Sequence, residues 1–461
     1  MKKTIFILSF SLMTIPAWSQ GKGPVISIEG GNIQGIETAT AGVFVYKGIP
    51  YAAPPTGDLR WREPEPVIPW MGVRLTDRFG MQSVQNDRVP GQFYQKEFYW
   101  MGDGVRSEDC LFLNVWSPAP GEADKKLPVA MWIHGGAYMS GSGGEIQMDG
   151  EAWAKRGVIL VTINYRLGIF GFLAHPLLSQ ESPNKVSGNY GIFDQLYALK
   201  WIKNNISQFG GDPDNITVFG QSAGAGSVQA LVASPLTKGM IRKAIIQSGG
   251  GISGLSEVMP DPTDLESVEK KWKEIMDKAG LTTISRLRSM SYADLMNALA
   301  ANSSMNQEKR LPVRLTPIKD GYISPKTFAE AVRSGEVADI PYMIGYTKND
   351  IGNMKEGIEQ FCLIREKTSK NPVYAYVFTR ALPGDDSGAF HSSELWFMFN
   401  TLGRSWRPFT KADFTLSEEM VDCWTNFARD GNPNGKSDHG WKPFTKATPN
   451  FMTFDIRQNN Q

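Results

Sequence analysis

Hydrophobic residues form two alternating patterns along most of the chain, after an opening of short strands. The opening stretches are separated by glycines and predict antiparallel strands at Val25–Ile28, Asn32–Glu37 and Val43–Tyr46. Continuous apolar runs at Leu127–Ile133 and Val158–Asn164 are typical of buried parallel strands. Apolar residues at helical spacing predict a helix over Tyr190–Phe209.

The same two patterns continue toward the end of the chain. They predict strands at Ile216–Phe219, Lys243–Gln247, Tyr342–Tyr346 and Val373–Phe378, and helices at Leu265–Lys278, Tyr292–Ala300 and Leu416–Arg429. Strands that alternate with helices after an antiparallel opening indicate an α/β protein. We therefore predict a mixed, mainly parallel sheet with helices on both faces and a small N-terminal antiparallel sheet.

The first nineteen residues have the pattern of a signal peptide. Lys2 and Lys3 precede an apolar run that is too short to cross a bilayer, and the run closes with Ala17-Trp18-Ser19. We expect cleavage after Ser19 and export to the periplasm or the medium. No linker or repeat divides the remainder, so we expect residues 20–461 to form a single domain.

Charge and metal-binding residue types narrow the range of functions. The net charge is +1 and no run of basic residues occurs, which argues against nucleic acid or an anionic membrane as a partner. No Cys-x-x-Cys or His-Glu-x-x-His pattern is present, and the histidines lie far apart. We therefore expect neither a metal nor another cofactor. The composition does not indicate an oligomeric state.

The strongest chemical signal is Gly220-Gln221-Ser222-Ala223-Gly224, which follows a predicted strand and leads into a run compatible with a helix. A serine on a tight strand-to-helix turn needs small neighbours, because the backbone is strained and the helix approaches the sheet closely. A purely structural turn could have the same residues. The strand and the helix on either side favour a nucleophilic serine.

A serine nucleophile needs a base, which is normally a histidine held by a carboxylate. Four histidines are candidates. His134 begins a glycine turn, His175 precedes a proline in a loop, and His439 lies in a polar stretch where we expect a solvated surface side chain. His391 follows the last predicted strand and lies C-terminal to the serine, the order found in hydrolases with this type of turn.

A second turn, His134-Gly135-Gly136-Ala137-Tyr138, directly follows the predicted strand Leu127–Ile133. Such a turn can direct successive backbone N–H groups at one point. Together with the N–H of Ala223 it would bind the oxyanion of a tetrahedral intermediate. The alternative is an ordinary turn at the end of a strand.

Further motifs surround these turns. They are Lys47-Gly48-Ile49-Pro50-Tyr51-Ala52, Leu59-Arg60-Trp61, Ser107-Glu108-Asp109-Cys110-Leu111-Phe112-Leu113-Asn114-Val115, Asn164-Tyr165-Arg166, Gly188-Asn189-Tyr190-Gly191, Asp194-Gln195 and Phe209-Gly210-Gly211-Asp212-Pro213. With the serine turn they resemble the type-B carboxylesterases, the family of carboxylesterases and cholinesterases within the α/β-hydrolase fold. The resemblance extends from about Gly35 to Asp455 and is highly specific.

The resemblance implies Ser222 as nucleophile, His391 as base and then acid, and Asp350 as the carboxylate that orients the histidine. It also implies that Arg60 and Glu108 form a structural ion pair. For the oxyanion hole it implies the N–H groups of Gly136, Ala137 and Ala223.

The chain departs from the family in three places. Asp350 stands where the family usually has glutamate, so either its loop lies closer to His391 or the acid is another residue, with Asp320 and Asp339 as weaker candidates. Ala137 replaces a third glycine of many members. The interval between Asp350 and His391 is shorter than is usual in the family, so we expect less helical covering at the mouth of the pocket.

These residues predict hydrolysis of a small carboxylic ester through an acyl-enzyme on Ser222, without a cofactor. An amidase or lactonase could use the same residues, and a different class is a catalytically inactive binding module of this fold. Such a module typically lacks the nucleophile, which is present here. The sequence does not indicate the natural substrate.

Cysteines and aromatic residues leave further questions open. Three cysteines are too few for a disulfide framework. By resemblance, Cys110 lacks its partner, because Ser83 occupies that position, and should be free and buried. Cys362 and Cys423 either pair or stay free. Aromatic residues stand before Glu108 and after His391, namely Phe93, Tyr94, Phe98, Tyr99, Trp100, Trp396, Phe397 and Phe399. Some of them could line a pocket, and we expect at least half to belong in the core.

Overall fold

A computed structural model describes residues 21–100, 102, 104–252, 264–302, 313–436 and 439–457. The segment expected to be a signal peptide therefore lies outside the described residues. The strands are β1 (Lys22–Ile28), β2 (Gly31–Glu37), β3 (Phe44–Pro50), β4 (Val73–Leu75), β5 (Phe112–Ser117), β6 (Leu127–Ile133), β7 (Ile159–Ile163), β8 (Gly211–Gln221), β9 (Lys243–Gln247), β10 (Tyr342–Thr347), β11 (Val373–Phe378) and β12 (Phe451–Phe454).

The helices vary from one turn to 20 residues in length. They are α1 (Phe93–Phe98), α2 (Glu151–Lys155), α3 (Gly168–Phe172), α4 (Pro176–Glu181), α5 (Tyr190–Asn205), α6 (Ala223–Ala233), α7 (Leu265–Lys278), α8 (Ile284–Ser289), α9 (Tyr292–Asn302), α10 (Phe328–Arg333), α11 (Met354–Thr368), α12 (Leu395–Met398) and α13 (Lys411–Asp430).

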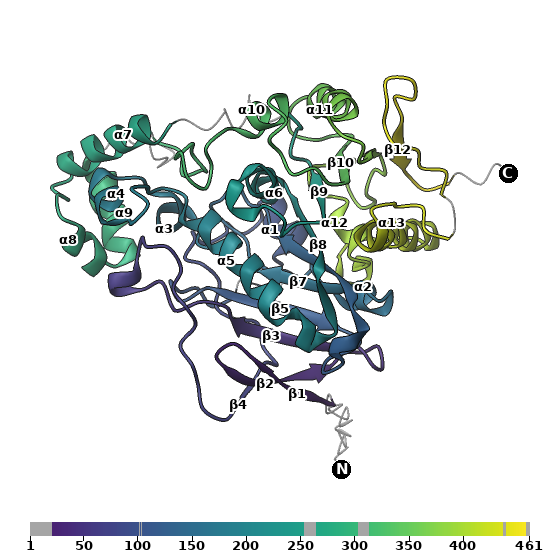
Figure 1. Cartoon of the computed structure of the whole chain (residues 1–461), viewed down its shortest axis with the longest axis horizontal. Coiled ribbons are helices and arrows are strands. Elements are labelled where there is room, and N and C mark those ends of the chain that lie inside the picture. Colours follow the sequence, from purple (N-terminus) through teal and green to yellow (C-terminus); the bar gives the residue numbers. More distant parts are fainter. Residues whose placement is uncertain are drawn as a thin grey trace, which may run out of the picture.

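The strands form one 12-stranded mixed sheet in the order β1-β2-β3-β5-β7-β6-β8-β9-β10-β11-β12, with β4 beside β2 (Figure 1). The pairs from β1 to β7 along this order are antiparallel, and every pair from β7 to β12 is parallel. The predicted mixed, mainly parallel sheet is confirmed. The N-terminal antiparallel strands are continuous with the parallel part of this sheet, because β5 pairs with β3 on one side and with β7 on the other.

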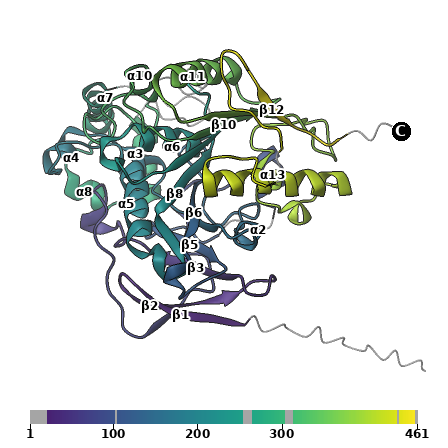
Figure 2. The ribbon, with the colours of Figure 1, turned by 45° about the vertical axis from the view of Figure 1, so that its right-hand side comes forward.

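Alternate residues of the central strands face two separate cores. On β6, Val129 and Met131 belong to one buried cluster, whereas Ala130 and Trp132 belong to the other. This two-sided burial explains why β6 is an uninterrupted apolar run, since helices cover both faces of a parallel sheet. Helices α5 and α6 lie on one side of β6 and β8, and α13 lies on the other (Figure 2).

The helices α4, α7, α8 and α9 form a group at one end of the sheet (Figure 1). Arg60 links this group to the rest of the fold. Its guanidinium forms a two-point ion pair with Glu108, at 2.7 and 2.5 Å, and donates to the carbonyls of Leu287 and Met290 at 2.7 and 2.8 Å. The structural role expected for Arg60 and Glu108 is confirmed.

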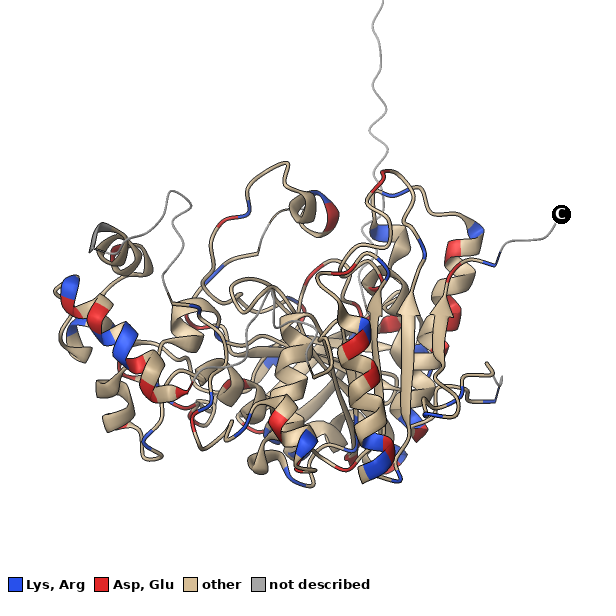
Figure 3. Cartoon of the chain, turned by 90° about the horizontal axis from the view of Figure 1, so that it is seen from above, with Lys and Arg blue, Asp and Glu red and all other residues tan. Residues whose placement is uncertain are grey.

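Acidic and basic residues are intermixed on the helices seen from above (Figure 3). On α7, for example, Lys273 pairs with Asp277 at 2.5 Å, one turn further along the helix. Within the residues described here, no helix has the length and the apolar composition that crossing a membrane requires.

Candidate active site

Ser222 lies at the turn between β8 and α6, as predicted. Its backbone dihedral angles are φ 58° and ψ −124°, a strained conformation for a residue with a side chain. Glycine is required two residues before and two residues after Ser222. A Cβ atom on Gly224 would lie 2.0 Å from the carbonyl oxygen of Ile133, and one on Gly220 would lie 2.6 Å from the backbone of Gly224. The local sequence therefore enforces a sharp turn that presents the serine side chain at the end of the strand.

The structure brings His391 and Asp350 into direct contact. Nδ1 of His391 lies 2.5 Å from Oδ1 of Asp350. The other carboxylate oxygen accepts hydrogen bonds from Ser248 Oγ at 2.6 Å and from the backbone N–H of Thr347 at 3.0 Å. Burial opposes ionisation of Asp350, but the contacts with His391 and Ser248 hold its pKa below the ordinary value. Asp350 is therefore placed as a carboxylate that accepts a hydrogen bond from the Nδ1–H of His391.

Two hydrogen bonds join the loop of Asp350 to the loop of His391. The N–H of Asn349 donates to the carbonyl of Ala389 at 3.0 Å, and the N–H of Ala389 donates to Oδ1 of Asn349 at 3.0 Å. The hydroxyl of Tyr94 also donates to the carbonyl of His391 at 3.1 Å. The shorter aspartate side chain reaches the imidazole because the two loops are held together.

The amide of Gln221 lies against the imidazole of His391. Its Nε2 is 3.2 Å from Nε2 and 3.5 Å from Nδ1 of the ring. A donor in line with the lone pair of one ring nitrogen would lie much farther from the other, so the amide faces the ring and does not occupy that lone pair. In the described part of the chain, Ser222 Oγ makes no hydrogen bond to His391. Catalytic hydrogen bonds are often long before a substrate binds.

The turn after β6 has the unusual backbone expected of an oxyanion site. Gly136, Ala137 and Tyr138 all have positive φ, at 100°, 55° and 59°. A Cβ atom on Gly136 would lie 2.0 Å from the carbonyl oxygen of Ser140, so glycine is required there. Among the residues that the structure describes, the N–H groups of Gly136, Ala137 and Ala223 have no hydrogen-bond acceptor. They are available to an oxyanion.

A cavity of about 350 Å³ connects these features, because Ser222, His391, Gly136 and Ala137 all line it. We call it the reaction cavity. Of the aromatic residues considered above, Tyr94, Phe98 and Tyr99 line it, and Trp396, Phe397 and Phe399 are buried in the core. Size and lining are those of a site for a small organic ligand.

The weaker candidates for the acid lie elsewhere. Asp320 accepts from Nδ2 of Asn189 at 2.8 Å and from nearby backbone N–H groups. Asp339 pairs with Arg365 at 2.7 Å. Both carboxylates have structural partners that do not include His391.

The other histidines also have structural places. His134 is buried and stacks on Tyr165, with ring centroids 4.5 Å apart, and burial lowers its pKa to about 4. His175 accepts a hydrogen bond from Leu177 N at the start of α4. The expectation of a solvated His439 is wrong, because its side chain is only 12% exposed beside Glu419.

All three cysteines are free and buried. The expectation for Cys110 is confirmed, and the possible pairing of Cys362 with Cys423 is not formed. The reason is topological: Cys362 on α11 belongs to one buried cluster and Cys423 on α13 to the other, on opposite faces of the sheet. The described residues contain no group of three or more His, Cys, Asp or Glu arranged to hold a metal ion.

Sequence reasoning missed two residues beside the candidate triad. Ser248, the residue after β9, donates to Asp350. Glu394 is fully buried, and its burial and the neighbouring Asp350 raise its pKa to about 7. The position of Ser248 at the carboxyl end of a parallel strand was the one available signal. Nothing in the local sequence distinguishes Glu394.

Comparisons with known proteins agree with this geometry. The model of the carboxylesterase family matches residues 22–365 and 357–461. Fumonisin B1 esterase of Sphingopyxis macrogoltabida is 32% identical, over 97% of this chain and 89% of its own length. Para-nitrobenzyl esterase of Bacillus subtilis is 31% identical, over 94% of both chains.

Solved structures show the same fold. A carboxylesterase of Geobacillus stearothermophilus aligns with a TM-score of 0.75 at 32% identity, over 94% of this chain and 96% of that one. A para-nitrobenzyl esterase aligns with a TM-score of 0.77 at 28% identity over the same shares. The α/β-hydrolase fold is thereby confirmed. The chain belongs to the carboxylesterase family and is a carboxylic-ester hydrolase.

Proposed function

We propose that the protein hydrolyses its ester through an acyl-enzyme on Ser222, with His391 as the base and Asp350 as the carboxylate that orients it. The observation that carries the proposal is the reaction cavity, which is lined by the serine, the histidine and the turn of Gly136 and Ala137. A nucleophile, a base and oxyanion donors around one cavity are what acyl transfer requires.

The steps follow from the groups present. Ser222 Oγ attacks the ester carbonyl while Nε2 of His391 takes its proton, and the N–H groups of Gly136, Ala137 and Ala223 bind the oxyanion. His391 then gives the proton to the leaving alkoxide, and an acyl group remains on the serine. Water attacks the acyl-enzyme by the same path and releases the acid. Asp350 holds the Nδ1–H tautomer and stabilises the transient imidazolium.

The substrate is proposed to be a small ester with a bulky alcohol portion. Among the relatives, one is named for fumonisin B1 and another for para-nitrobenzyl esters. The aromatic side chains of Tyr94, Phe98 and Tyr99 along the reaction cavity support an apolar group next to the ester. An amide or a lactone could react by the same steps, so both belong in the substrate panel.

Residues 1–19 are proposed to direct export, so that the mature protein begins at Gln20. Residues 20–461 are proposed to form one domain. Expression of the full chain in a bacterium, followed by fractionation and N-terminal sequencing, tests the position. A product that stays in the cytoplasm with residues 1–19 attached contradicts the proposal.

Ser222→Ala is the deciding test of the mechanism. With 4-nitrophenyl acetate as substrate, the variant should lose on the order of 10⁶ in kcat. Ser140→Ala is the matched control, because Ser140 also lines the reaction cavity but has no base beside it, and its kcat should change little. Retention of more than a few per cent of the activity by Ser222→Ala, with unchanged thermal unfolding, would refute the nucleophile.

A covalent probe gives an independent reading. An aryl phosphonate should add one phosphonyl group to the wild-type protein, and mass spectrometry of the peptides should locate that group on Ser222. The Ser222→Ala variant should remain unlabelled. Labelling at any other serine assigns the nucleophile elsewhere.

A further inference from the structure

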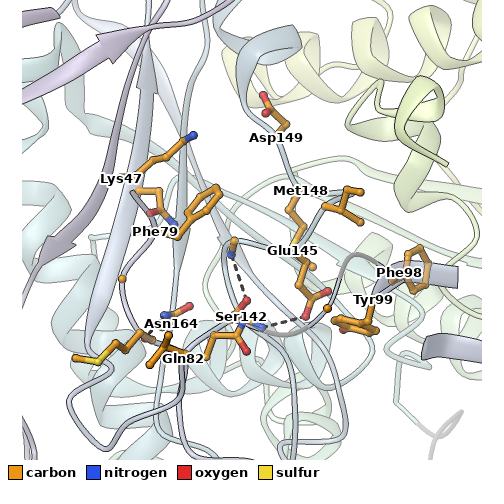
Figure 4. A pocket seen from close by; sticks show the side chains of 18 of the residues that line it. Lys47, Phe79, Gln82, Phe98, Tyr99, Ser142, Glu145, Met148, Asp149 and Asn164 are labelled. Atoms are coloured by element: carbon orange, nitrogen blue, oxygen red, sulfur yellow. Dashed lines mark hydrogen bonds between the residues drawn. The ribbon is translucent and has the colours of Figure 1, made fainter. Parts of the chain in front are cut away.

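A second cavity, of about 660 Å³, lies beside the reaction cavity. The two share a wall, because Phe98, Tyr99, Glu145 and Met148 line both. We call the larger one the side cavity. In Figure 4, Lys47 and Phe79 lie on one side of it and Phe98 and Tyr99 on the opposite side. None of the proposed steps of ester hydrolysis uses it.

Lys47 brings into this cavity a cation that has no close ion pair with any described residue. It comes from β3, and its Nζ lies 4.8 Å from the centre of the Phe79 ring. Its ammonium makes no hydrogen bond to any described residue, and Asp149 and Asp77 attract it only at longer range. Removal from water lowers the pKa of Lys47, although Asp149 partly offsets this. An anion that reached Nζ would replace the interactions with water that the ammonium has lost on burial.

The other charged residues that the structure describes near that end of the side cavity have ion-pair partners. Arg404 donates to Asp149 at 2.7 Å and to the carbonyl of Ile146 at 3.3 Å. Asp77 lies 3.8 Å from the guanidinium of Arg78. Among the described residues at this end of the side cavity, the charge left without an ion-pair partner is therefore positive.

Glu145 lies in the shared wall and is occupied by its own contacts. Its carboxylate accepts from the N–H of Ser142 at 3.0 Å and from Nε2 of Gln147 at 2.6 Å, and Tyr99 also bonds to it. Burial raises the pKa of Glu145. Its acidic group is thus satisfied by the protein and has little tendency to attract a cation.

Apolar side chains form much of the remaining lining. Phe79 is 43% exposed, and Met148 and Phe98 present buried apolar surface. Val105, which is largely exposed, also lines the cavity. A volume of this size is typical of sites for small organic ligands, which are mostly apolar with a few polar groups that fix orientation.

We propose that the side cavity is a second binding site, for an organic monocarboxylate whose carboxylate binds Lys47 and whose apolar part packs along Phe79 and Met148. The ligand has the chemistry of an acid that ester hydrolysis releases. The site itself does not depend on the proposed triad, since none of its contacts involves Ser222 or His391.

The test measures binding of octanoate by calorimetry to protein whose reaction cavity has been closed by phosphonylation. One octanoate should bind per chain. Affinity should rise by about fourfold for each methylene from butanoate to octanoate, because each methylene leaves water. Loss of all binding on phosphonylation would place octanoate in the reaction cavity and overturn the proposal.

Lys47→Met removes the charge and keeps an unbranched side chain that is shorter by one atom. Octanoate affinity should fall by about 10- to 100-fold, the effect of one hydrogen bond to a charged group. Lys367→Met, at an exposed position of α11, is the matched control and should bind like the wild type. Equal affinity of Lys47→Met and the wild type overturns the assignment of Lys47.

A comparison of ligands on the unaltered protein needs no variant. Octylamine and octanamide have the same chain as octanoate but carry a positive charge or none. Both should bind at least 10-fold more weakly than octanoate. If octylamine binds as tightly or more tightly, the carboxylates of Asp149 and Glu145 determine the charge preference and the proposal fails.

Discussion

Asn349 and Ala389 hold each other by two hydrogen bonds, from Asn349 N to Ala389 O and from Ala389 N to Asn349 Oδ1, each 3.0 Å long. Asn349 directly precedes Asp350, and Ala389 lies two residues before His391. This bridge brings the Asp350 loop against the His391 loop. It explains how an aspartate can make a 2.5 Å contact with Nδ1 where the family usually has the longer glutamate.

Loss of the Asn349 side chain should loosen this bridge. In Asn349→Ala, Ala389 N loses its acceptor, and the carboxylate should no longer hold the imidazole in one position. A shift of about 1 Å at a catalytic group can cost about 10²-fold, so we expect kcat to fall by up to that factor while KM changes little. Steady-state kinetics with 4-nitrophenyl acetate give both values.

Asn371→Ala is the control for this variant. Asn371 also bonds to backbone through its side chain, donating to the carbonyl of Asp339 at 2.9 Å, far from the site. Its kcat should equal that of the wild type. Equal kinetics of Asn349→Ala and Asn371→Ala would mean that the bridge does not position the acid.

Asp350 should tolerate neither loss of charge nor extra length. Asp350→Asn favours the wrong histidine tautomer and should lower kcat by about 10⁴-fold. Asp350→Glu keeps the charge, but its added methylene does not fit between two loops that are already tied together. Its kcat should lie between those of Asp350→Asn and the wild type. Full activity of Asp350→Glu contradicts the fit, and full activity of Asp350→Asn contradicts the role.

The sequence predicted best the elements whose burial follows a regular pattern, two-sided in the central parallel strands and one-sided in α7. β6 and β9 have the predicted bounds, since a parallel strand between two helical layers is an uninterrupted apolar run. β5 was missed as a strand. Its Asn114 interrupts the apolar pattern, and only the fold supplies Thr162 and the N–H of Gly48 as partners for that polar side chain.

The candidate site also contains some residues that could be located from the sequence and others that could not. The turns at Ser222 and Gly136 could be located because their strain demands glycine nearby, which is a local signal. The contact between Asp350 and His391 joins two separate loops, so the resemblance to a family was needed to suggest it. Glu394 could not be found, because its environment consists of residues from distant segments.

Glu394 should make stability depend on pH in a specific direction. Burial and the nearby Asp350 raise its pKa to about 7, above the ordinary 4.5 of glutamate. The folded protein thus holds this proton more tightly than the unfolded chain. The contribution to stability is full below about pH 4.5 and is lost as the pH rises through about 7.

Glu394→Gln cannot ionise and should escape this loss. Relative to the wild type, its free energy of unfolding should improve between pH 5 and pH 8.5 by an amount on the order of 3 kcal/mol. Urea unfolding of both proteins at the two pH values gives the difference, in which the other titrating groups cancel. A difference that is constant with pH shows that Glu394 ionises normally in the folded protein.

The cysteines should react as three free, protected thiols. Burial raises the pKa of the thiols of Cys110, Cys362 and Cys423, so little thiolate is present at neutral pH. The native protein should react slowly with a thiol reagent. In the denatured, unreduced protein, three thiols per chain should react with the reagent at once. One equivalent instead of three would mean that a disulfide joins two of them and that the packing on α11 or α13 differs.

The entrance to the reaction cavity should be open on the alcohol side. Of the residues between Asp350 and His391, only Ile351 lines the cavity. Helix α11 in this interval packs against β10 and β11. Because this interval supplies no helix over the cavity, esters of methyl, phenyl and naphthyl alcohols with one acyl group should have similar kcat/KM values. A sharp decline toward naphthyl would show that the mouth is closed by something else.

The acyl side should be narrow, because the methyl group of Ala137 lies beside the proposed oxyanion site. Along 4-nitrophenyl acetate, butanoate, hexanoate and octanoate, kcat/KM should fall steeply, since one methylene in a pocket is worth about 1 to 3 kcal/mol. Ala137→Gly keeps the N–H, suits the positive φ of 55° and removes the methyl group, so it should flatten the series. If kcat/KM climbs from acetate to octanoate in the wild type, or if Ala137→Gly leaves the slope unchanged, Ala137 does not limit the acyl group.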